Sequence, residues 1–136
     1  MIKKFLLIIT ILTLLISCAT YKDNISISTS ILNGKTYKLV NMFDKNAITI
    51  SFHNEEFYGY GGVNTYYGKY QMRIGNIILF NNITTTSVNT EMTEEAQIIE
   101  KEYLDVLMSV ASIEFTSDGI KLITLDNTEL VFKKLN

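Results

Sequence analysis

One stretch of the chain, Thr93 to about Met108, differs in period from everything around it. Its apolar residues recur at helical spacing, and acidic side chains occupy the remaining positions. The apolar set is Ile99, Tyr103, Val106 or Leu107, and Val110, and the outward-facing acids are Glu94, Glu95, Glu100, Glu102 and Asp105. Thr93 suits the N-cap position. The pattern predicts one helix, which is too little to cover both faces of a large sheet.

The other folded segments are predicted to be short strands. Ala47–His53 shows the pattern best, because apolar and polar side chains alternate as in a strand with one buried face. The expected strands are 35–40, 47–53, 56–60, 68–74 and 77–80 before the helix, and 112–115, 120–125 and 129–132 after it. Asn81 and Asn82 are expected to end the fifth strand, and Thr84–Thr86 is interpreted as a polar strand or a loop entering the helix.

Five strands, one helix and three more strands indicate an α+β domain over residues 31–136. Tight turns such as Gly75-Asn76 and Asp118-Gly119 make neighbouring strands antiparallel. With a single helix, the sheet must curl around it or close on itself. We therefore predict a strongly curved antiparallel sheet, or open barrel, with the helix packed at its mouth or along one side.

The N-terminus carries an export signal. Lys3 and Lys4 precede an apolar run, 5–16, that is shorter than the ~20 residues a membrane helix needs but suits a signal-peptide core. The segment Leu15-Ile16-Ser17-Cys18 resembles the lipobox of bacterial lipoproteins. That resemblance implies cleavage before Cys18 and membrane attachment through acyl chains, such as palmitate, on that cysteine.

This interpretation divides the chain into a signal peptide (1–17), a polar, flexible tether (18–30) and the domain (31–136). Ala19 follows the cysteine where an Asp would suggest retention at the inner membrane, so we expect the periplasmic face of the outer membrane if the organism has two membranes. Two alternatives remain open. One is an ordinary secretory signal with a chance cysteine, and the other is an uncleaved N-terminal membrane helix.

The charge balance argues against nucleic acid as a partner. Lys3 and Lys4 leave with the signal, so acidic side chains outnumber basic ones in the remainder. The basic residues are scattered, whereas phosphate binding needs concentrated Lys and Arg. The expected partners are the membrane, through lipid on Cys18, and an envelope protein or an apolar ligand. No cofactor is expected.

Glycine is concentrated in one segment of the chain, where four of the seven glycines fall within residues 59–68. Glycine tolerates positive φ and close backbone approach, so this segment is predicted to be a tight bend between two strands. The bend is interpreted as a fold-determining turn without a ligand, although its exposed edge offers a partner site. Phosphate binding is disfavoured because a phosphate loop leads from a strand into a helix.

The glycine-rich segment resembles the META domain of the HslJ-like lipoproteins, and the resemblance extends over about residues 31–136. That family has a Gly-x-x-Gly-Cys-Asn pattern, a Gly-x-Tyr, a Thr-x-Met-x-Cys stretch and a Glu-x-x-aromatic-Leu helix. The matching positions here are Gly59, Gly62, Val63, Asn64, Gly68, Tyr70, Thr86, Glu100, Tyr103 and Leu104. The resemblance implies structural roles for the motif residues that match.

Both cysteines of the family pattern are replaced here, by Val63 and Thr90. In the family these cysteines look placed to pair, so their joint replacement is what loss of a structural disulfide predicts, and neither is a catalytic thiol. Such a disulfide contributes a few kcal/mol. Tyr37 stands where the family commonly has Trp, at an expected core position.

No catalytic or metal-binding pattern is present. His53 is the single histidine and falls on the polar face of its strand, with Ser51 on the same face but no acidic partner evident. We therefore expect that the protein is not an enzyme. The resemblance implies a non-enzymatic binding or structural module of the cell envelope, associated with stress tolerance. The alternatives are an apolar-ligand carrier or secretion-pilot-like lipoprotein and, third, a hydrolase.

Overall fold

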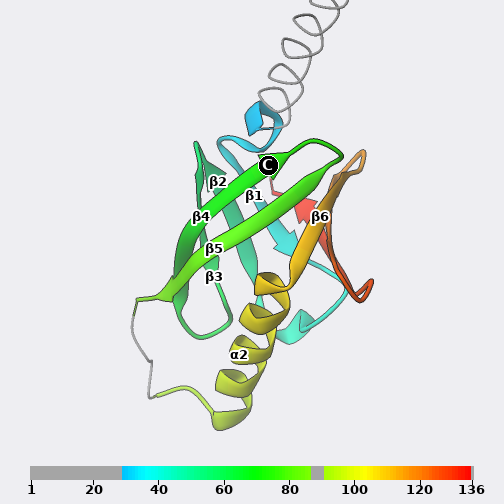
Figure 1. Cartoon of the computed structure of the whole chain (residues 1–136). Coiled ribbons are helices and arrows are strands. Elements are labelled where there is room, and N and C mark those ends of the chain that lie inside the picture. The colour runs from blue at the N-terminus through cyan, green and yellow to red at the C-terminus, as the bar shows by residue number, and fades with distance from the viewer. Residues whose placement is uncertain (1–28, 87–90, 136) are drawn as a thin grey trace, which may run out of the picture.

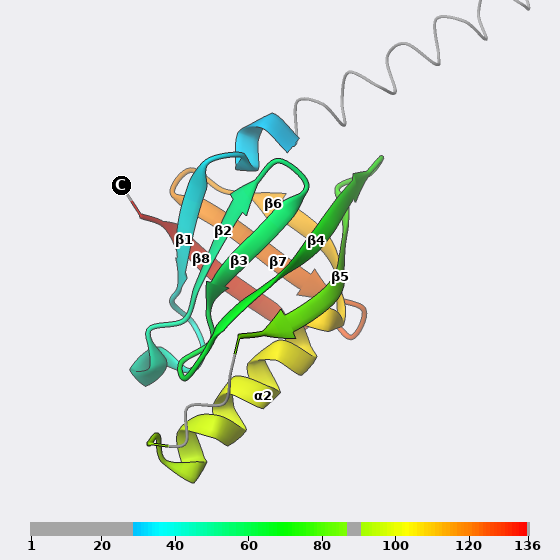
Figure 2. The same ribbon diagram turned by 90° about the vertical axis from the view of Figure 1, so that its left-hand side faces the viewer.

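Eight antiparallel strands, neighbours in space in the order of the sequence, close into a barrel in the computed structural model (Figures 1 and 2). The structure describes residues 29–86 and 91–135. The strands are β1 (Lys35–Leu39), β2 (Thr49–His53), β3 (Glu56–Tyr60), β4 (Thr65–Arg73), β5 (Ile77–Thr85), β6 (Val110–Phe115), β7 (Gly119–Thr124) and β8 (Glu129–Lys134). A 3-10 turn, η1 (Asp44–Asn46), precedes β2, and the helix α2 (Glu94–Met108) joins β5 to β6.

The barrel is closed, whereas an open one was predicted. β1 pairs with β8, with Leu39 opposite Phe132, so the first and last strands complete the ring. Closure satisfies the backbone groups that a curved open sheet would leave exposed at its edges. The least paired seam is between β5 and β6, where Ile77 and Ser112 form the single registered pair.

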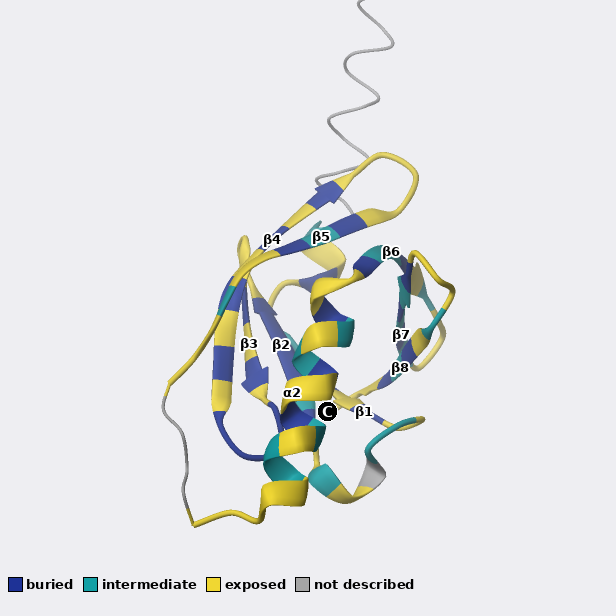
Figure 3. Cartoon of the chain, turned by 60° about the horizontal axis from the view of Figure 1, so that its bottom comes forward, coloured by how far each residue is buried: buried dark blue, intermediate teal, exposed yellow. Residues whose placement is uncertain are grey.

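The helix α2 lies at one end of the barrel, next to the ends of β2 and β3 (Figure 3). Thr93 is its N-cap as predicted, and its hydroxyl oxygen accepts a hydrogen bond of 3.3 Å from the backbone N–H of Ala96. The buried residues of α2 are Glu100, Tyr103 and Leu107. The placement of Glu100 on the solvent face was therefore wrong, because a loop of the barrel covers its carboxylate.

Side chains fill the interior of the barrel. Aromatic rings form much of this core, with Phe52 and Tyr70 packed edge to face at 5.1 Å between centroids and Phe57 and Phe80 at 4.9 Å. Tyr37 is buried, as the sequence predicted. The apolar residues at the centre, all fully buried, include Ile50, Tyr66, Ile78, Tyr103, Leu107, Ile113, Ile120, Leu122 and Leu130.

β5 does not end at Asn81 and Asn82 as predicted. The strand continues to Thr85, so Thr84 and Thr85 are strand rather than loop. Asn82 adopts a left-handed conformation (φ 55°) inside a bulge, where two residues of β5 face Gly68 alone on β4. Asparagine tolerates this conformation, which is why a pair that usually marks a turn is accommodated within a strand.

The chain enters the barrel through a helical turn at 29–32, within and just after the end of the expected tether. Leu32 from this turn is fully buried in the core. The signal segment, the rest of the tether, Cys18 and Thr90 all lie outside the described residues.

Candidate functional site

The glycine-rich bend 61–64 joins β3 to β4 at the end of the barrel that carries α2. The N–H of Gly61 donates to the carbonyl of Asn64 at 2.9 Å, which closes the bend. The hydroxyl of Tyr60 donates to the carbonyl of Gly62 at 2.9 Å. Gly62 has φ +107°, a backbone conformation that L side chains rarely adopt, so this position requires glycine.

The carboxylate of Glu100 from α2 binds this bend. Its Oε2 accepts the backbone N–H groups of Val63 at 3.0 Å and Asn64 at 2.6 Å, and its Oε1 accepts the Asn64 side-chain amide at 2.6 Å. A Cβ at Gly61 would lie 2.7 Å from Oε2, so glycine leaves room for the carboxylate. Glu100 is only 7% exposed, and three N–H donors compensate the burial of its charge.

A pair of buried tyrosines lies beside this contact and also joins the helix to the barrel. The hydroxyls of Tyr66 and Tyr103 are 2.6 Å apart, and Tyr66 also donates to the carbonyl of Thr49 at 2.6 Å. Because Tyr66 has one proton to donate, Tyr103 is the donor within the pair. Burial raises the pKa of both phenols, and the neighbouring Tyr103 raises that of Tyr66 further.

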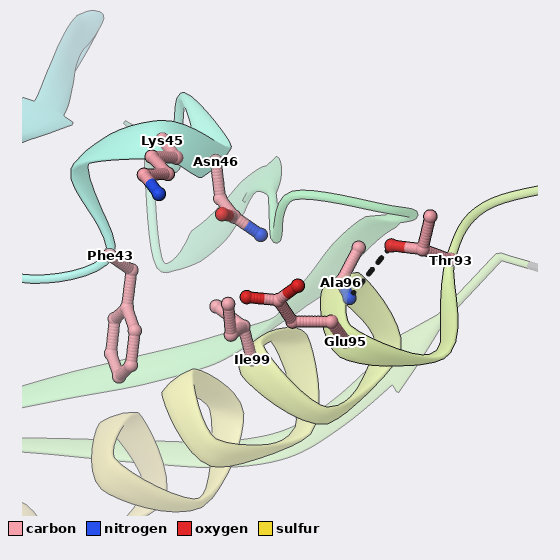
Figure 4. A pocket seen from close by; sticks show the side chains of 7 residues that line it. All are labelled: Phe43, Lys45, Asn46, Thr93, Glu95, Ala96 and Ile99. Carbon is pink, nitrogen blue, oxygen red and sulfur yellow. Dashed lines mark hydrogen bonds between the residues drawn. The ribbon is translucent and has the colours of Figure 1, made fainter.

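A surface hollow of about 410 Å³ opens next to the bend, between η1 and the first turns of α2 (Figure 4). Its lining mixes apolar, amide and charged side chains: Phe43, Lys45, Asn46, Thr93, Glu95, Ala96 and Ile99. Asn46 links the hollow to the bend, since a Cβ at Gly62 would approach its side chain to 3.0 Å.

The backbone on both sides of η1 is left-handed. Phe43 has φ 51° and Ala47 has φ 49°, although neither is glycine or asparagine. Such conformations cost about 1–3 kcal/mol each and persist where the surrounding structure requires them. Packing of Phe43 against the core supplies that constraint. The turn is therefore held in one shape, which presents Lys45 and Asn46 at the hollow.

The family model for the META domain matches residues 28–136. The chain belongs to the META domain family. No curated protein matches the sequence.

Solved structures share the META-domain fold of this chain. A protein from Burkholderia xenovorans, solved by NMR, is 19% identical with a TM-score of 0.63, and the match covers 81% of this chain and 88% of that one. A second NMR structure is 19% identical with a TM-score of 0.58, covering 77% and 92%. A DUF4847 family protein from Bacteroides vulgatus ATCC 8482 is 12% identical with a TM-score of 0.55, covering 79% and 94%. At these identities the likeness shows the fold alone.

The structure gathers most of the motif residues around the contact between the bend and α2. Gly62, Asn64 and Glu100 form the contact between bend and helix, and Gly59 in β3 packs against Tyr66 beside it. Gly68 and Tyr70 lie farther along β4, and Thr86 lies beside the bend, next to Thr65. Gly68 packs on the Phe57 ring, Tyr70 donates its hydroxyl to the carbonyl of Asn54 at 2.7 Å, and Thr86 bonds to the carbonyl of Thr65.

The pairing of Tyr66 with Tyr103 was not predicted from the sequence, and neither was η1. Tyr66 alternates with exposed neighbours along β4, which marks it as inward-facing, but nothing in the sequence identifies the residue it meets. The signal for Glu100 was present, because it precedes Tyr103 by three residues and so lies on the same helix face. η1 gave no periodic signal.

Reactive side chains are not gathered in the described part of the chain. His53 is exposed at the end of β2, opposite Glu56 in the hairpin, and Ser51 is buried with its hydroxyl 2.8 Å from that of Thr36. Residues 29–86 and 91–135 contain no cluster of potential metal ligands. Within the same ranges, no helix has both the length and the apolar character needed to cross a bilayer.

Proposed function

We propose that this META-domain protein is a lipid-anchored binding or structural module of the bacterial cell envelope, with no reaction of its own. Two features support the proposal: the family membership of residues 28–136 and the lipobox-like segment that ends at Cys18. Acyl chains on Cys18 would hold the barrel at a membrane surface, because each buried CH₂ contributes about 0.8 kcal/mol and two or three chains anchor stably. A role in envelope stress tolerance is part of the proposal.

One observation carries the non-enzymatic part of the proposal. The polar groups at the contact between the bend and α2 form hydrogen bonds that hold the fold. Glu100 accepts three of them, and the Tyr66 hydroxyl donates to the carbonyl of Thr49 and accepts from the hydroxyl of Tyr103. A catalytic carboxylate needs a free position beside a substrate. What the rigid bend and η1 offer to the outside is a shaped surface, and binding is the function that such a surface supports.

The filled interior gives no support to the alternative of an apolar-ligand carrier. The residues that line the inside of the barrel, among them Ile50 and Leu122, pack against one another with essentially no exposure. The hollow beside η1 is open and partly charged, unlike the enclosed apolar cavity that a lipid carrier needs. We therefore place the proposed contact surface on the outside of the barrel.

Site-specific photo-crosslinking in living cells tests this proposal. A benzophenone amino acid replaces Lys45, which is exposed at the hollow, in the full chain. The matched control replaces Ile74, which is also exposed but lies in the β4–β5 turn, far from the start of α2 (Figure 1). We expect an envelope component crosslinked from position 45 and not from position 74. Equal crosslinking from both positions, or none from either, would contradict the proposal.

A further inference from the structure

A second hollow, of about 520 Å³, lies on the outside of β3, β4 and β5, the three strands that stand side by side in Figure 2. Its walls are the outward-facing side chains of these strands, and its floor is formed by Phe57 and Gly68. The lining residues are Glu56, Phe57, Tyr58, Tyr67, Gly68, Lys69, Asn82 and Thr84, here called the tyrosine groove. The volume falls within the roughly 300–1,000 Å³ typical of small-ligand sites.

Two exposed aromatic rings dominate the tyrosine groove. Tyr58 is 50% exposed and Tyr67 is 49% exposed, and they are directly opposite each other on β3 and β4. Directly paired side chains on one sheet face stand about 4.5–5.5 Å apart at Cβ. Half-exposed rings in a hollow leave apolar surface in water that a ligand can cover. Neither phenol takes part in a hydrogen bond with the described residues.

The charged groups of the groove balance one another, and the Thr84 hydroxyl donates a long hydrogen bond of 3.4 Å to the carbonyl of Asn82. Glu56 faces Lys69 across β3 and β4, yet the two form no ion pair within residues 29–86 and 91–135. Asn82 and Thr84 add an amide and a hydroxyl on the β5 side. A carboxylate, an ammonium, an amide and a hydroxyl together donate and accept hydrogen bonds, while their net charge is zero.

The shape of the groove is fixed by the bulge beneath it. Gly68 cannot carry a side chain, because its Cβ would lie 2.7 Å from both the Asn81 carbonyl oxygen and the Phe57 ring. The bulge at Asn82 increases the local twist of the sheet. The rings of Tyr58 and Tyr67 are therefore held on a rigid strand surface, which lowers the ordering cost of binding.

We infer that the tyrosine groove binds a net-neutral pyranose glycan. A pyranose ring has C–H groups on its faces, which pack on aromatic rings, and hydroxyls at its edge, which need both donors and acceptors. The groove supplies both kinds of contact. The rings of Tyr58 and Tyr67 offer aromatic surface to the sugar faces, and the surrounding polar side chains, which together carry no net charge, offer hydrogen-bond donors and acceptors to the hydroxyls. A protein partner is disfavoured, since a stable interface needs about 800 Å² per side and this surface is a small concavity. The biological source of the glycan depends on the proposed envelope location, whereas the binding itself does not.

Titration of the full chain, purified in detergent, with defined oligosaccharides tests the inference. The probes are cellohexaose, chitohexaose and polygalacturonate, and calorimetry measures the dissociation constants. We expect saturable binding of at least one of the two neutral hexasaccharides, and the preferred one distinguishes a plain from an N-acetylated glycan. Tyr58→Ala and Tyr67→Ala should each weaken that binding about tenfold or more. The distant Ile74→Ala should change it less than about twofold.

An NMR titration of the wild-type chain tests the same inference without relying on variants, which could fail to fold. NMR titration of the wild-type chain should shift the resonances of Tyr58, Tyr67 and Lys69 and leave those of Leu125, in the β7–β8 turn, unchanged. Three results would overturn the inference. These are the absence of saturable binding of either neutral probe, binding of polygalacturonate alone, and binding that shifts resonances elsewhere while those of Tyr58, Tyr67 and Lys69 stay unchanged. In cells, crosslinking of a protein rather than a glycan from position 67 also overturns it. None of these results bears on crosslinking at Lys45, so the two proposals fail separately.

Discussion

Glu100 and Asn64 are joined by two hydrogen bonds of 2.6 Å, one from the backbone N–H of Asn64 and one from its side-chain amide. The contact joins the middle of α2 to the bend between β3 and β4, residues 36 apart in the sequence. Asn64, together with the N–H of Val63, compensates the burial of the Glu100 carboxylate, and the contact fixes the one long helix of the described residues to the end of the barrel. The motif is therefore a structural joint of this META domain.

Replacement of this carboxylate should destabilise the fold strongly. In Glu100→Gln, the side chain keeps one carbonyl oxygen but brings an NH₂ group toward the N–H donors of Val63 and Asn64. We expect the free energy of unfolding to fall by about 2–4 kcal/mol, measured by urea denaturation. Glu102→Gln, at an exposed position of the same helix, serves as the control and should change it by less than about 0.5 kcal/mol. Equal effects of the two substitutions would refute the structural role of Glu100.

Gly59 is required by close packing rather than by its backbone angles. In Gly59→Ala, the new Cβ would overlap the carbonyl oxygen of Thr49 and lie 2.6 Å from the Tyr66 hydroxyl. Backbone of a paired strand cannot move aside cheaply, so we expect a loss of about 3 kcal/mol or more. Gly75→Ala, in a turn with φ +78° and no atom within 4 Å of the new Cβ, should cost only about 1 kcal/mol. Thermal unfolding of both variants checks the order, and a smaller loss at Gly59 than at Gly75 would contradict it.

Stability should fall in alkaline solution because of the buried phenols. Burial, with the negative charge of Glu55 and the neighbouring Tyr37, raises the pKa of Tyr70 to about 12, and burial also raises the pKa of Tyr66 and Tyr103. Above the unfolded-state pKa of about 10, the unfolded chain loses protons that the folded chain keeps, so stability decreases as the pH rises. The contribution of Tyr70 is fully present below pH 10 and is lost progressively up to about pH 12.

Urea denaturation from pH 8 to 12 measures this dependence. Tyr70→Phe removes one of the titrating groups while keeping the ring, so its stability should decline less steeply with pH than that of the wild type. The comparison uses each protein's own value at pH 8 as reference, which removes the separate loss of the bond to the Asn54 carbonyl. Parallel curves for the two proteins would show that Tyr70 does not carry the effect.

Attachment to the membrane should depend on a single side chain. If Cys18 carries the acyl chains, Cys18→Ser should move the protein from the membrane to the soluble fraction, because no other residue of the lipobox-like segment offers a thiol. Ser17→Ala, which keeps a small residue beside the cleavage position, should leave the protein at the membrane. Separation of cells into membrane and soluble fractions, followed by detection of the protein with an antibody, distinguishes the two variants. A membrane-bound Cys18→Ser protein would favour the uncleaved N-terminal helix.

The elements of this fold were predictable where a local pattern determines them. α2 and its N-cap Thr93 were found because helical period and capping are properties of neighbouring residues. The turn at Gly75-Asn76 was found for the same reason, and both of its residues adopt positive φ. The location of the strands was largely right, and errors were mostly at their ends, where pairing with another strand decides how far a strand extends.

The remaining features depend on contacts between distant residues. Closure of the barrel depends on the pairing of β1 with β8, which are more than ninety residues apart in the sequence. No local sequence pattern predicts this pairing. Glu100 was assigned to solvent because it is charged, and the bend that receives it lies 36 residues earlier. The tyrosine groove was also missed, since Tyr58 and Tyr67 come together only through the register of β3 and β4.

Intact-mass analysis of the full-length gene product, extracted from membranes of its own cells, tests the proposed location most directly. The account predicts a chain that begins at Cys18, lacks residues 1–17 and carries the added mass of two or three acyl chains. A polypeptide of all 136 residues, unmodified at Cys18 and recovered from the soluble cytoplasmic fraction, would contradict it.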